Sequence, residues 1–309
     1  MVRQPLTIPW WARILTIVAS IIAIVPAMAA LASVDHTGMF LQVIPYAWIL
    51  LVSVGMERIR GGSHVTLGLP LRPLAARDAF KGAMYALAAL TFVVGAALAL
   101  GATWSGVAIT SGLGIALLSV LLTIVLAAGE ELLFRGVIMQ AISERFGTVT
   151  AVLVTSVPFG LAHAANPDAG TVSVVNTVLA GIALGAMVVV NRSLWLAIGF
   201  HAMWNVGVAA GIGSLSGFDS FPYRVAVLDT TSLDAWRWLV DGPYGIEEGL
   251  ATTVALVIIT VVVLRSQRYD AFVEAARQRR SIAERRRSYT APSPSSSTEG
   301  SATSSSHDV

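Results

Sequence analysis

One stretch of the chain decides its fold: residues 113–139 read LGIALLSVLLTIVLAAGEELLFRGVIM. The run is long and apolar enough to cross a bilayer, because a hydrocarbon core of about 30 Å needs about 20 residues of helix. It nevertheless carries Glu130, Glu131 and Arg135. A charge near the bilayer centre costs at least about 2.5–3.5 kcal/mol on insertion scales, so an uncompensated cluster there indicates a use. His163 and His201, in later apolar runs, make the cluster a candidate site.

The composition indicates a membrane protein. Of the 309 residues, 55% are hydrophobic and only 12% are charged, and the mean hydropathy is +0.74. A soluble domain carries about 25% charged residues. We therefore predict an all-α, polytopic helical membrane protein. The chain has no cysteine, which excludes disulfides, cysteine-ligated zinc and cysteine nucleophiles.

Apolar runs of span length recur along the chain. We predict about eight transmembrane helices at residues 12–33, 40–56, 80–102, 113–134 (continuing to about 145), 148–166, 171–190, 193–211 and 246–264. The first run ends near Ala27-Met28-Ala29, which resembles a signal cleavage site. It is longer than the usual apolar core of a signal peptide, so we expect a retained helix.

Lysine and arginine predict the topology. With the N-terminus inside, all but two of the 20 basic residues fall on the inner side, leaving Arg224 and Arg237 outside. Acidic residues dominate the outer connections, namely Asp35, Asp168, Asp219, Asp229, Asp234, Asp241, Glu247 and Glu248. Because basic residues near the spans face the cytoplasm, we expect a cell-membrane protein with both termini cytoplasmic.

The same patterns divide the chain into four regions. Residues 1–110 hold the first three helices, and residues 111–212 hold a core of four helices that carries the candidate site. Residues 213–265 contain an outer loop and the last helix, and residues 266–309 a basic juxtamembrane segment and a Ser-rich tail too poor in apolar residues to fold. The outer loop favours a short interfacial helix because of its aromatic residues, Phe221, Tyr223, Trp236 and Trp238.

Spacing brings polar residues of different spans to one level. Gly147 is the expected turn between the fourth and fifth spans, and Glu130 lies 17 residues before it and His163 16 after it. At 1.5 Å per residue, both lie about 25 Å along antiparallel helices from the turn. His201 and Asn205 are one turn apart and share a helix face.

Helical geometry also separates the two glutamates. Adjacent helical residues point about 100° apart, so we expect that Glu130 and Glu131 cannot both face one target. Glu131 and Arg135 have the i, i+4 spacing and order of an intrahelical ion pair. Glu130 is then left for His163, and Phe159, one turn before His163, is expected to wall the site.

Three motifs in this region resemble the signature of the CPBP family of intramembrane glutamic endopeptidases. This family comprises CAAX prenyl proteases and bacteriocin-processing or abortive-infection homologues. The motifs are Glu130-Glu131-x-x-x-Arg135, Phe159-x-x-x-His163 and His201-x-x-x-Asn205, in order, on three predicted spans. The resemblance covers roughly residues 113–211, about a third of the chain.

The resemblance implies a mechanism and a set of roles. Glu130 acts as the general base, and His163 positions the attacking water or shares its proton. His201 and Asn205 supply an oxyanion site, while Glu131, Arg135 and Phe159 support these residues. The resemblance also implies no cofactor and no metal, a peptide or membrane-protein substrate within the lipid bilayer, and no nucleic acid partner. The substrate itself is not identified by any residue.

Other interpretations remain open at this point. One glutamate and two histidines match the ligand types of a catalytic zinc, although the chain lacks H-E-x-x-H. A silent scaffold or chaperone would use the same polar residues for packing, with His201 and Asn205 joining helices. A transporter with a proton-coupled carboxylate is a third class, but no pair of Gly/Pro-broken segments indicates a repeat. We expect Asn166, Asp168 and Asn176 to be solvated near an outer loop.

Overall fold

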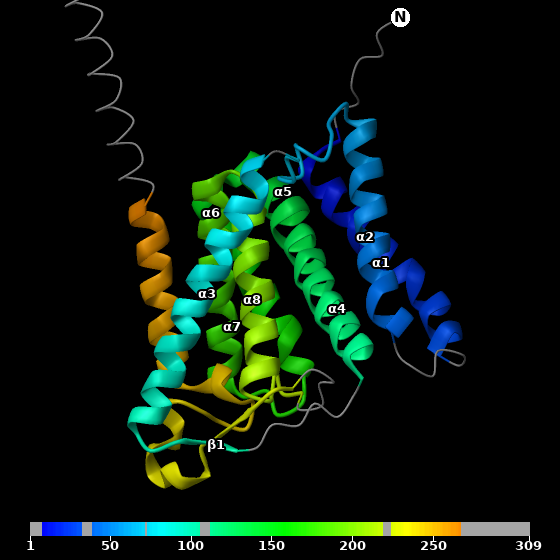
Figure 1. Ribbon diagram of the computed structural model, residues 1–309. Helices are drawn as coiled ribbons and strands as arrows, with labels where there is room; N and C mark the ends of the chain where they lie inside the picture. The colour runs from blue at the N-terminus through cyan, green and yellow to red at the C-terminus, as the bar shows by residue number, and fades with distance from the viewer. Residues whose placement is uncertain (1–7, 33–38, 72, 106–111, 219–223, 267–309) are drawn as a thin grey trace, which may run out of the picture. The chain divides into compact units, whose positions relative to one another are not determined.

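Helices make up nearly all the regular structure of this computed structural model (Figure 1). The structure describes residues 8–32, 39–71, 73–105, 112–218 and 224–266. The chain divides into two compact units, residues 1–264 and residues 265–309. The predicted Ser-rich tail and the predicted interfacial residues Phe221 and Tyr223 lie outside the described residues.

Every predicted span contains a helix. The helices are α1 (Trp10–Ala32), α2 (Met39–Ile59), α3 (Pro73–Ala99), α4 (Leu113–Glu131), α5 (Met139–Phe146), α6 (Thr148–Ala162), α7 (Thr171–Asn191), α8 (Trp195–Gly211) and a last helix, Leu250–Ser266. Five helical stretches among the described residues are long and apolar enough to cross a membrane: α1, α3, the continuous stretch Leu113–Phe146, α6 with its extension to Ala165, and α7. The count of eight spans stays a prediction.

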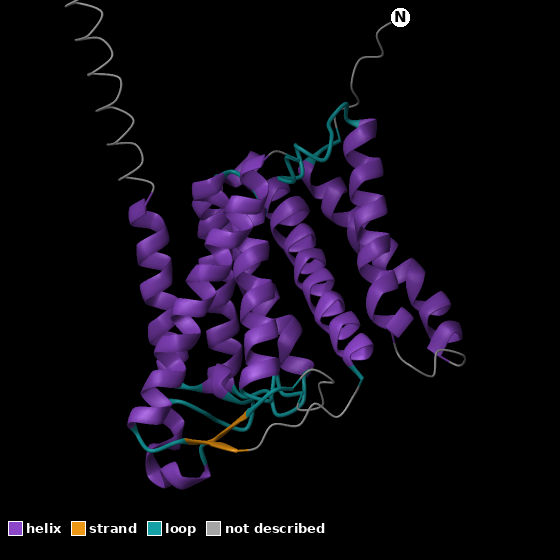
Figure 2. Ribbon diagram, in the orientation of Figure 1, coloured by secondary structure: helices purple, strands orange, loops and turns teal. Residues whose placement is uncertain are grey.

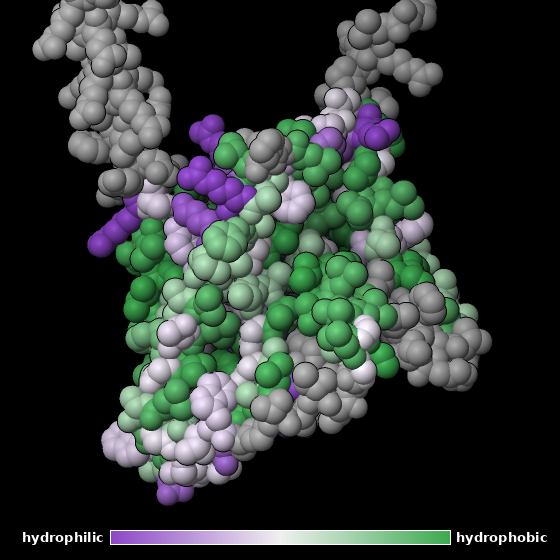
Figure 3. All heavy atoms as spheres, in the orientation of Figure 1, coloured by the Kyte–Doolittle hydropathy of each residue, from purple (hydrophilic) through white to green (hydrophobic). Residues whose placement is uncertain are grey.

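The outer faces of these helices are apolar. Large hydrophobic side chains such as Leu117 on α4 and Leu161 on α6 are 61% and 58% exposed. On the visible face of the molecule, hydrophobic surface runs along the helices and hydrophilic surface gathers toward their ends (Figure 3). Exposed apolar area of this extent suits contact with lipid rather than with water.

Two predicted helices differ in detail from the structure. The fourth span is not a continuous α-helix, because a π-helical segment, Leu132–Ile138, joins α4 to α5. Such segments are rare and often occur at functional sites, since the wider turn changes where side chains point. The fifth span ends as an α-helix at Ala162, and a 3-10 turn, His163–Ala165, follows it. His163 therefore caps a helix end.

One end of the helices carries the remaining structure (Figure 2). Strand β1 (Thr103–Ser105) pairs antiparallel with β2 (Val227–Asp229), and two 3-10 segments follow, Thr231–Leu239 and Ile246–Glu248. The first of these segments exposes Trp236 and Trp238 by 61% and 58%. Exposed tryptophans on a short helical segment are what an interfacial helix requires.

An ion-pair network joins α1, α2 and α5 at the end that the sequence places in the cytoplasm. Glu57 of α2 pairs with Arg60 at 2.6 Å and with Arg13 of α1 at 3.6 Å. Arg13 and Arg60 also both pair with Glu144 of α5. Because Arg13 and Glu57 are both buried, the pair between them is shielded from solvent, and the network as a whole ties the first two helices to α5.

Helix α8, which carries His201, packs against α3 through glycine. A Cβ atom added at Gly82 of α3 would lie 2.0 Å from the backbone oxygen of Leu196. One added at Gly199 of α8 would lie 1.9 Å from the backbone oxygen of Ala79. The two backbones are thus in direct contact, as small residues permit between membrane helices.

Gly199→Ala is therefore expected to destabilise the protein by about 1–3 kcal/mol. The new methyl group meets a backbone atom, which moves only if α3 moves away from α8. Gly211→Ala is the matched control on the same helix, because a Cβ there has nothing within 4 Å. The Tm of each purified variant in detergent measures the effect, and equal Tm values for the two variants would contradict it.

Candidate active site

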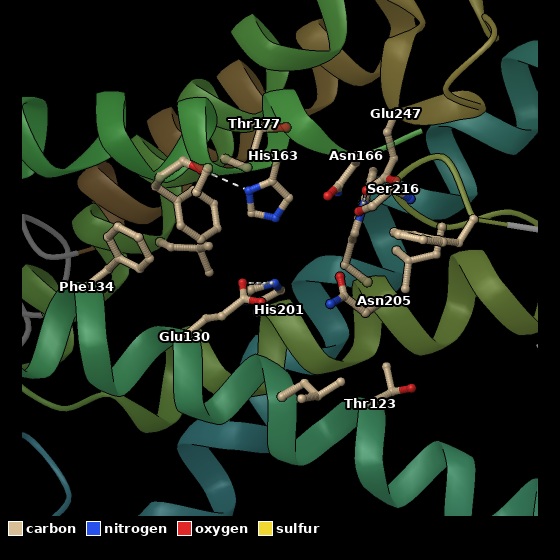
Figure 4. A pocket seen from close by; sticks show the side chains of 18 of the residues that line it. Thr123, Glu130, Phe134, His163, Asn166, Thr177, His201, Asn205, Ser216 and Glu247 are labelled. Carbon is tan, nitrogen blue, oxygen red and sulfur yellow. Dashed lines mark hydrogen bonds and ion pairs between the residues drawn. The ribbon is translucent and has the colours of Figure 1, made fainter. Parts of the chain in front are cut away.

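The turn at Gly147 reverses the chain, so that α5 and α6 lie next to each other. Gly147 has a φ of +81°, a conformation that glycine adopts without strain. The two helical stretches that it joins both lead to one cavity of about 1290 Å³, with Glu130 and His163 in its wall. Both side chains point into this cavity (Figure 4). The spacing in the sequence predicted this meeting.

A buried cluster lies beside the cavity. Glu131 accepts a hydrogen bond from Arg135 at 2.8 Å, which confirms the predicted intrahelical ion pair. The same carboxylate oxygen lies 2.9 Å from Nδ1 of His201, whose N–H donates to it. The second guanidinium nitrogen of Arg135 donates to the backbone oxygen of Gly181 at 3.2 Å. The exposed fractions of Glu131, Arg135 and His201 are 0%, 1% and 8%.

Glu130 makes different contacts from those predicted. Its Oε1 accepts a hydrogen bond from the Tyr46 hydroxyl at 3.2 Å, and its Oε2 lies 3.8 Å from Nε2 of His201. Among the described residues, no hydrogen bond joins Glu130 to His163. Oε2 is buried and accepts no hydrogen bond from the described residues, while the Glu130 side chain as a whole lines the cavity.

The expectation that the two glutamates cannot share a target is wrong. Glu130 and Glu131 both lie beside the His201 ring, at opposite nitrogens. The ring has two nitrogens on different edges, so carboxylates that point about 100° apart can each reach one of them. The prediction considered only the angle between the two glutamate side chains and not the two separate nitrogens of the histidine ring.

The ring of His163 is fixed by its own helix. Its Nδ1 lies 2.8 Å from the backbone oxygen of Phe159, and because a carbonyl only accepts, Nδ1 carries the hydrogen. In the neutral ring, Nε2 is then the acceptor. Figure 4 shows this second nitrogen facing the cavity.

Phe159 forms part of the wall of the site, as predicted. Its side chain is 2% exposed, and its ring lies 5.0 Å from the His163 ring and 6.0 Å from the His201 ring, centroid to centroid. The Arg135 guanidinium lies 4.2 Å from the same ring centroid, a cation–π contact. One aromatic ring thus touches both histidines and the buried cation.

Asn205 lies one turn beyond His201 on α8 and lines the same cavity. Its side chain points into the cavity beside His201 (Figure 4). All four residues expected to do chemistry therefore meet at one place. The other side of the cavity is largely apolar, with α4 supplying Leu118, Leu122 and Leu126.

Three residues outside the sequence motifs line this site or hold its wall in place. Tyr46 and Glu247 line the cavity, and Glu247 accepts hydrogen bonds from the Trp204 indole at 3.0 Å and from the Ser216 backbone. Asn176 was expected to be solvated, but it is 2% exposed and donates to the backbone oxygens of Glu247 and Gly249. Its amide needs these partners because it is buried, and it thereby pins the outer loop to α7.

The geometry gives the zinc interpretation no support. In the part of the chain that the structure describes, no three His, Cys, Asp or Glu side chains are placed to hold a metal ion. Glu131 is already engaged by Arg135 and His201, and Nδ1 of His163 by Phe159. The donor set that remains is one carboxylate oxygen and two ring nitrogens on separate helices.

Glu247→Gln is expected to change how stability depends on pH. Burial raises the pKa of Glu247, although hydrogen bonds from Ser216 and Trp204 oppose the shift. The folded protein then holds this proton more tightly than the unfolded chain does, so stability falls as pH rises from the ordinary carboxyl range through the raised value. Glutamine does not titrate. The Tm of the wild type should therefore fall more steeply than that of the variant as pH rises above the ordinary carboxyl range of about 4.

Asp229→Asn is the control of opposite sign. Hydrogen bonds from the hydroxyl and the backbone N–H of Thr231 lower the pKa of Asp229, so the stability it contributes is lost as pH falls through its folded pKa. The Tm of Asp229→Asn should therefore fall less steeply than that of the wild type as pH falls through the folded pKa of Asp229. Parallel Tm curves for the wild type and Glu247→Gln would refute the assignment.

Comparison with known proteins agrees with the site. Residues 112–207 match the family model described as type II CAAX prenyl endopeptidase Rce1-like. No curated protein matches the chain. The matched segment contains α4 to α7 and most of α8, which carry both glutamates, both histidines and Asn205. Together with the five apolar helical stretches, it identifies a multi-pass membrane protein. The match covers about a third of the chain, and it supports the resemblance of this segment to the CPBP family, which includes the CAAX prenyl endopeptidases.

Proposed function

We propose that the protein is an intramembrane endopeptidase that hydrolyses a peptide bond with an activated water molecule and without a metal ion. The observation that carries the proposal is that the Glu130 carboxylate and the imidazole of His163 line one cavity, and that the bond from Nδ1 of His163 to Phe159 leaves its Nε2 as an acceptor. A water molecule between them can donate one hydrogen to each. Such placement of two bases is what general-base activation of water requires.

In the proposed reaction, the water oxygen attacks the carbonyl carbon of the scissile bond as Glu130 takes a proton from the water. A C–O bond forms, the carbonyl oxygen becomes an oxyanion, and Glu130 holds the proton. That proton then passes to the amide nitrogen, the C–N bond breaks, and a carboxylic acid and an amine leave. His163 orients the water through Nε2, because its Nδ1–H is held by Phe159.

Asn205 and His201 are the proposed donors to the oxyanion. The amide of Asn205 donates directly, whereas His201 donates from Nε2 only when both of its nitrogens carry hydrogen. The charges of the cluster favour this form. Glu130 and Glu131 carry two negative charges against the single positive charge of Arg135, and a protonated His201 brings the sum to zero. Preorganised donors of this kind commonly contribute about 3–4 kcal/mol.

The proposed substrate is a peptide or a membrane protein. Helix α4 supplies apolar side chains such as Leu118, Leu122 and Leu126 to the cavity wall, and the cavity volume of about 1290 Å³ exceeds that of a typical small-molecule pocket. An extended peptide segment with apolar side chains fits this lining. We further propose that the protein lies in the cell membrane with both termini in the cytoplasm, as the distribution of lysine and arginine indicates.

Glu130→Gln and His163→Ala are expected to abolish cleavage and leave the fold intact. General-base catalysis typically contributes about 10²–10⁴-fold, so product formation should fall by at least about 10²-fold. Comparative peptidomics of membranes that contain each variant measures this fall. Asp234→Asn, a substitution of an exposed residue that does not line the cavity, is the control, and a chelator should leave the wild type active. Wild-type product levels from Glu130→Gln would rule out the mechanism.

Glu131→Ala is expected to lower the stability of the protein, unlike Glu130→Gln. Breaking a buried ion pair by removing one partner costs about 3–5 kcal/mol, because the other charge stays buried without compensation. Arg135 would be left in that state, and His201 would lose the carboxylate that orients its ring. The Tm in detergent should therefore fall for Glu131→Ala and stay near the wild-type value for Glu130→Gln. If instead the two variants were equally stable, the structural role of Glu131 would be excluded.

A further inference from the structure

One contact of Glu130 comes from a helix outside the segment that matches the family. Tyr46 lies on α2, 84 residues before Glu130, and its hydroxyl donates to Oε1 of Glu130 at 3.2 Å. Its side chain is half-buried and forms part of the cavity wall. Among the described residues, Tyr46 is the one that donates a hydrogen bond to the Glu130 carboxylate.

The position of the Tyr46 ring is constrained a second time by Gly129. A Cβ atom added at Gly129 would lie 2.2 Å from Cδ1 of Tyr46, 2.6 Å from Cγ and 2.8 Å from its Cβ. The ring therefore packs directly against the backbone of α4, one residue before Glu130. Only glycine leaves room for a tyrosine at this distance. Two independent observations thus fix the phenol beside the carboxylate.

We propose that Tyr46 is a positioning residue for Glu130 in the hydrolysis reaction. The inference rests on the proposed function. A glutamate side chain rotates about three bonds, and the next contact of this carboxylate is the looser one of 3.8 Å to His201. The phenol binds Oε1 and so restricts the orientation of the Glu130 carboxylate, which lines the cavity and is the group proposed to take the proton from water. Holding a reacting group in one geometry lowers the barrier, and a misplacement of about 1 Å can cost about 10²-fold.

Helix α2 does not depend on Tyr46 for its place. Glu57, near the end of α2, forms ion pairs with Arg13 and Arg60, and both of these arginines also pair with Glu144 of α5. Removal of one hydroxyl group leaves this network whole. Tyr46→Phe also keeps the ring that packs on Gly129. The substitution therefore tests the hydrogen bond and not the packing of α2.

The first measurement does not need a substrate. The infrared band of the Glu130 carboxyl group is identified as the difference between the spectra of the purified wild type and Glu130→Gln. In Tyr46→Phe this band is expected to shift, because the carboxylate loses a hydrogen bond. Tyr85→Phe, which alters a half-buried tyrosine of α3 outside the cavity, should leave the band unchanged. An unshifted band in Tyr46→Phe overturns the proposal, whether or not the protein is a protease.

The second measurement is the rate of cleavage. Membranes with Tyr46→Phe should form the Glu130-dependent peptides about 10- to 100-fold more slowly than the wild type, at an unchanged Tm. Gly129→Ala displaces the ring while keeping the hydroxyl and should slow the same peptides. A shifted band with wild-type rates overturns the positioning role. A shifted band in a protein that forms no Glu130-dependent peptides at all counts against the proposed function, while the contact itself stands.

Discussion

The structure depends on one buried ion pair. Glu131 and Arg135 are almost fully buried, in a protein whose surroundings supply little solvation for charge. Neither charge is tolerable alone at this depth, so every other partner of the pair is constrained in turn. Arg135 reaches the backbone of α7 at Gly181 and the ring of Phe159 on α6, and Glu131 reaches His201 on α8. Four helices are thus set relative to one another by a single cluster.

This constraint also explains how adjacent glutamates come to differ. Glu131 binds both Arg135 and Nδ1 of His201, and the bond to Nδ1 orients the histidine ring. Glu130 has no cation of its own on the helix. Its carboxylate accepts a hydrogen bond from the Tyr46 phenol and lines the cavity. A carboxylate buried in an ion pair and a carboxylate in the cavity wall arise from the same helical turn because their surroundings differ.

The sequence predicted the parts of the site that local geometry controls. The Glu131–Arg135 pair follows from an i, i+4 spacing, and the meeting of Glu130 with His163 follows from equal distances to Gly147. Contacts between distant segments were missed. Tyr46 belongs to no motif, and Glu247 has the pattern of an ordinary solvated loop residue. The π-helical segment at Leu132–Ile138 was also not visible in the hydropathy pattern, because the pattern counts apolar residues and not hydrogen bonds.

The chemistry and the walls of the cavity come from different parts of the chain. Both glutamates, both histidines and Asn205 lie within residues 112–207, which match the family. Tyr46, Ser216, Glu247 and Leu256 line the same cavity from α2, the outer loop and the last helix, outside that segment. Asn176 binds the outer loop through two backbone oxygens, and the hydroxyl of Thr253 on the last helix donates to its amide oxygen at 2.6 Å. A buried amide with this many partners holds the outer wall in one arrangement. Under the proposed function, the part of the cavity wall that a substrate would meet beyond the motifs is therefore built by segments outside the residues that match the family.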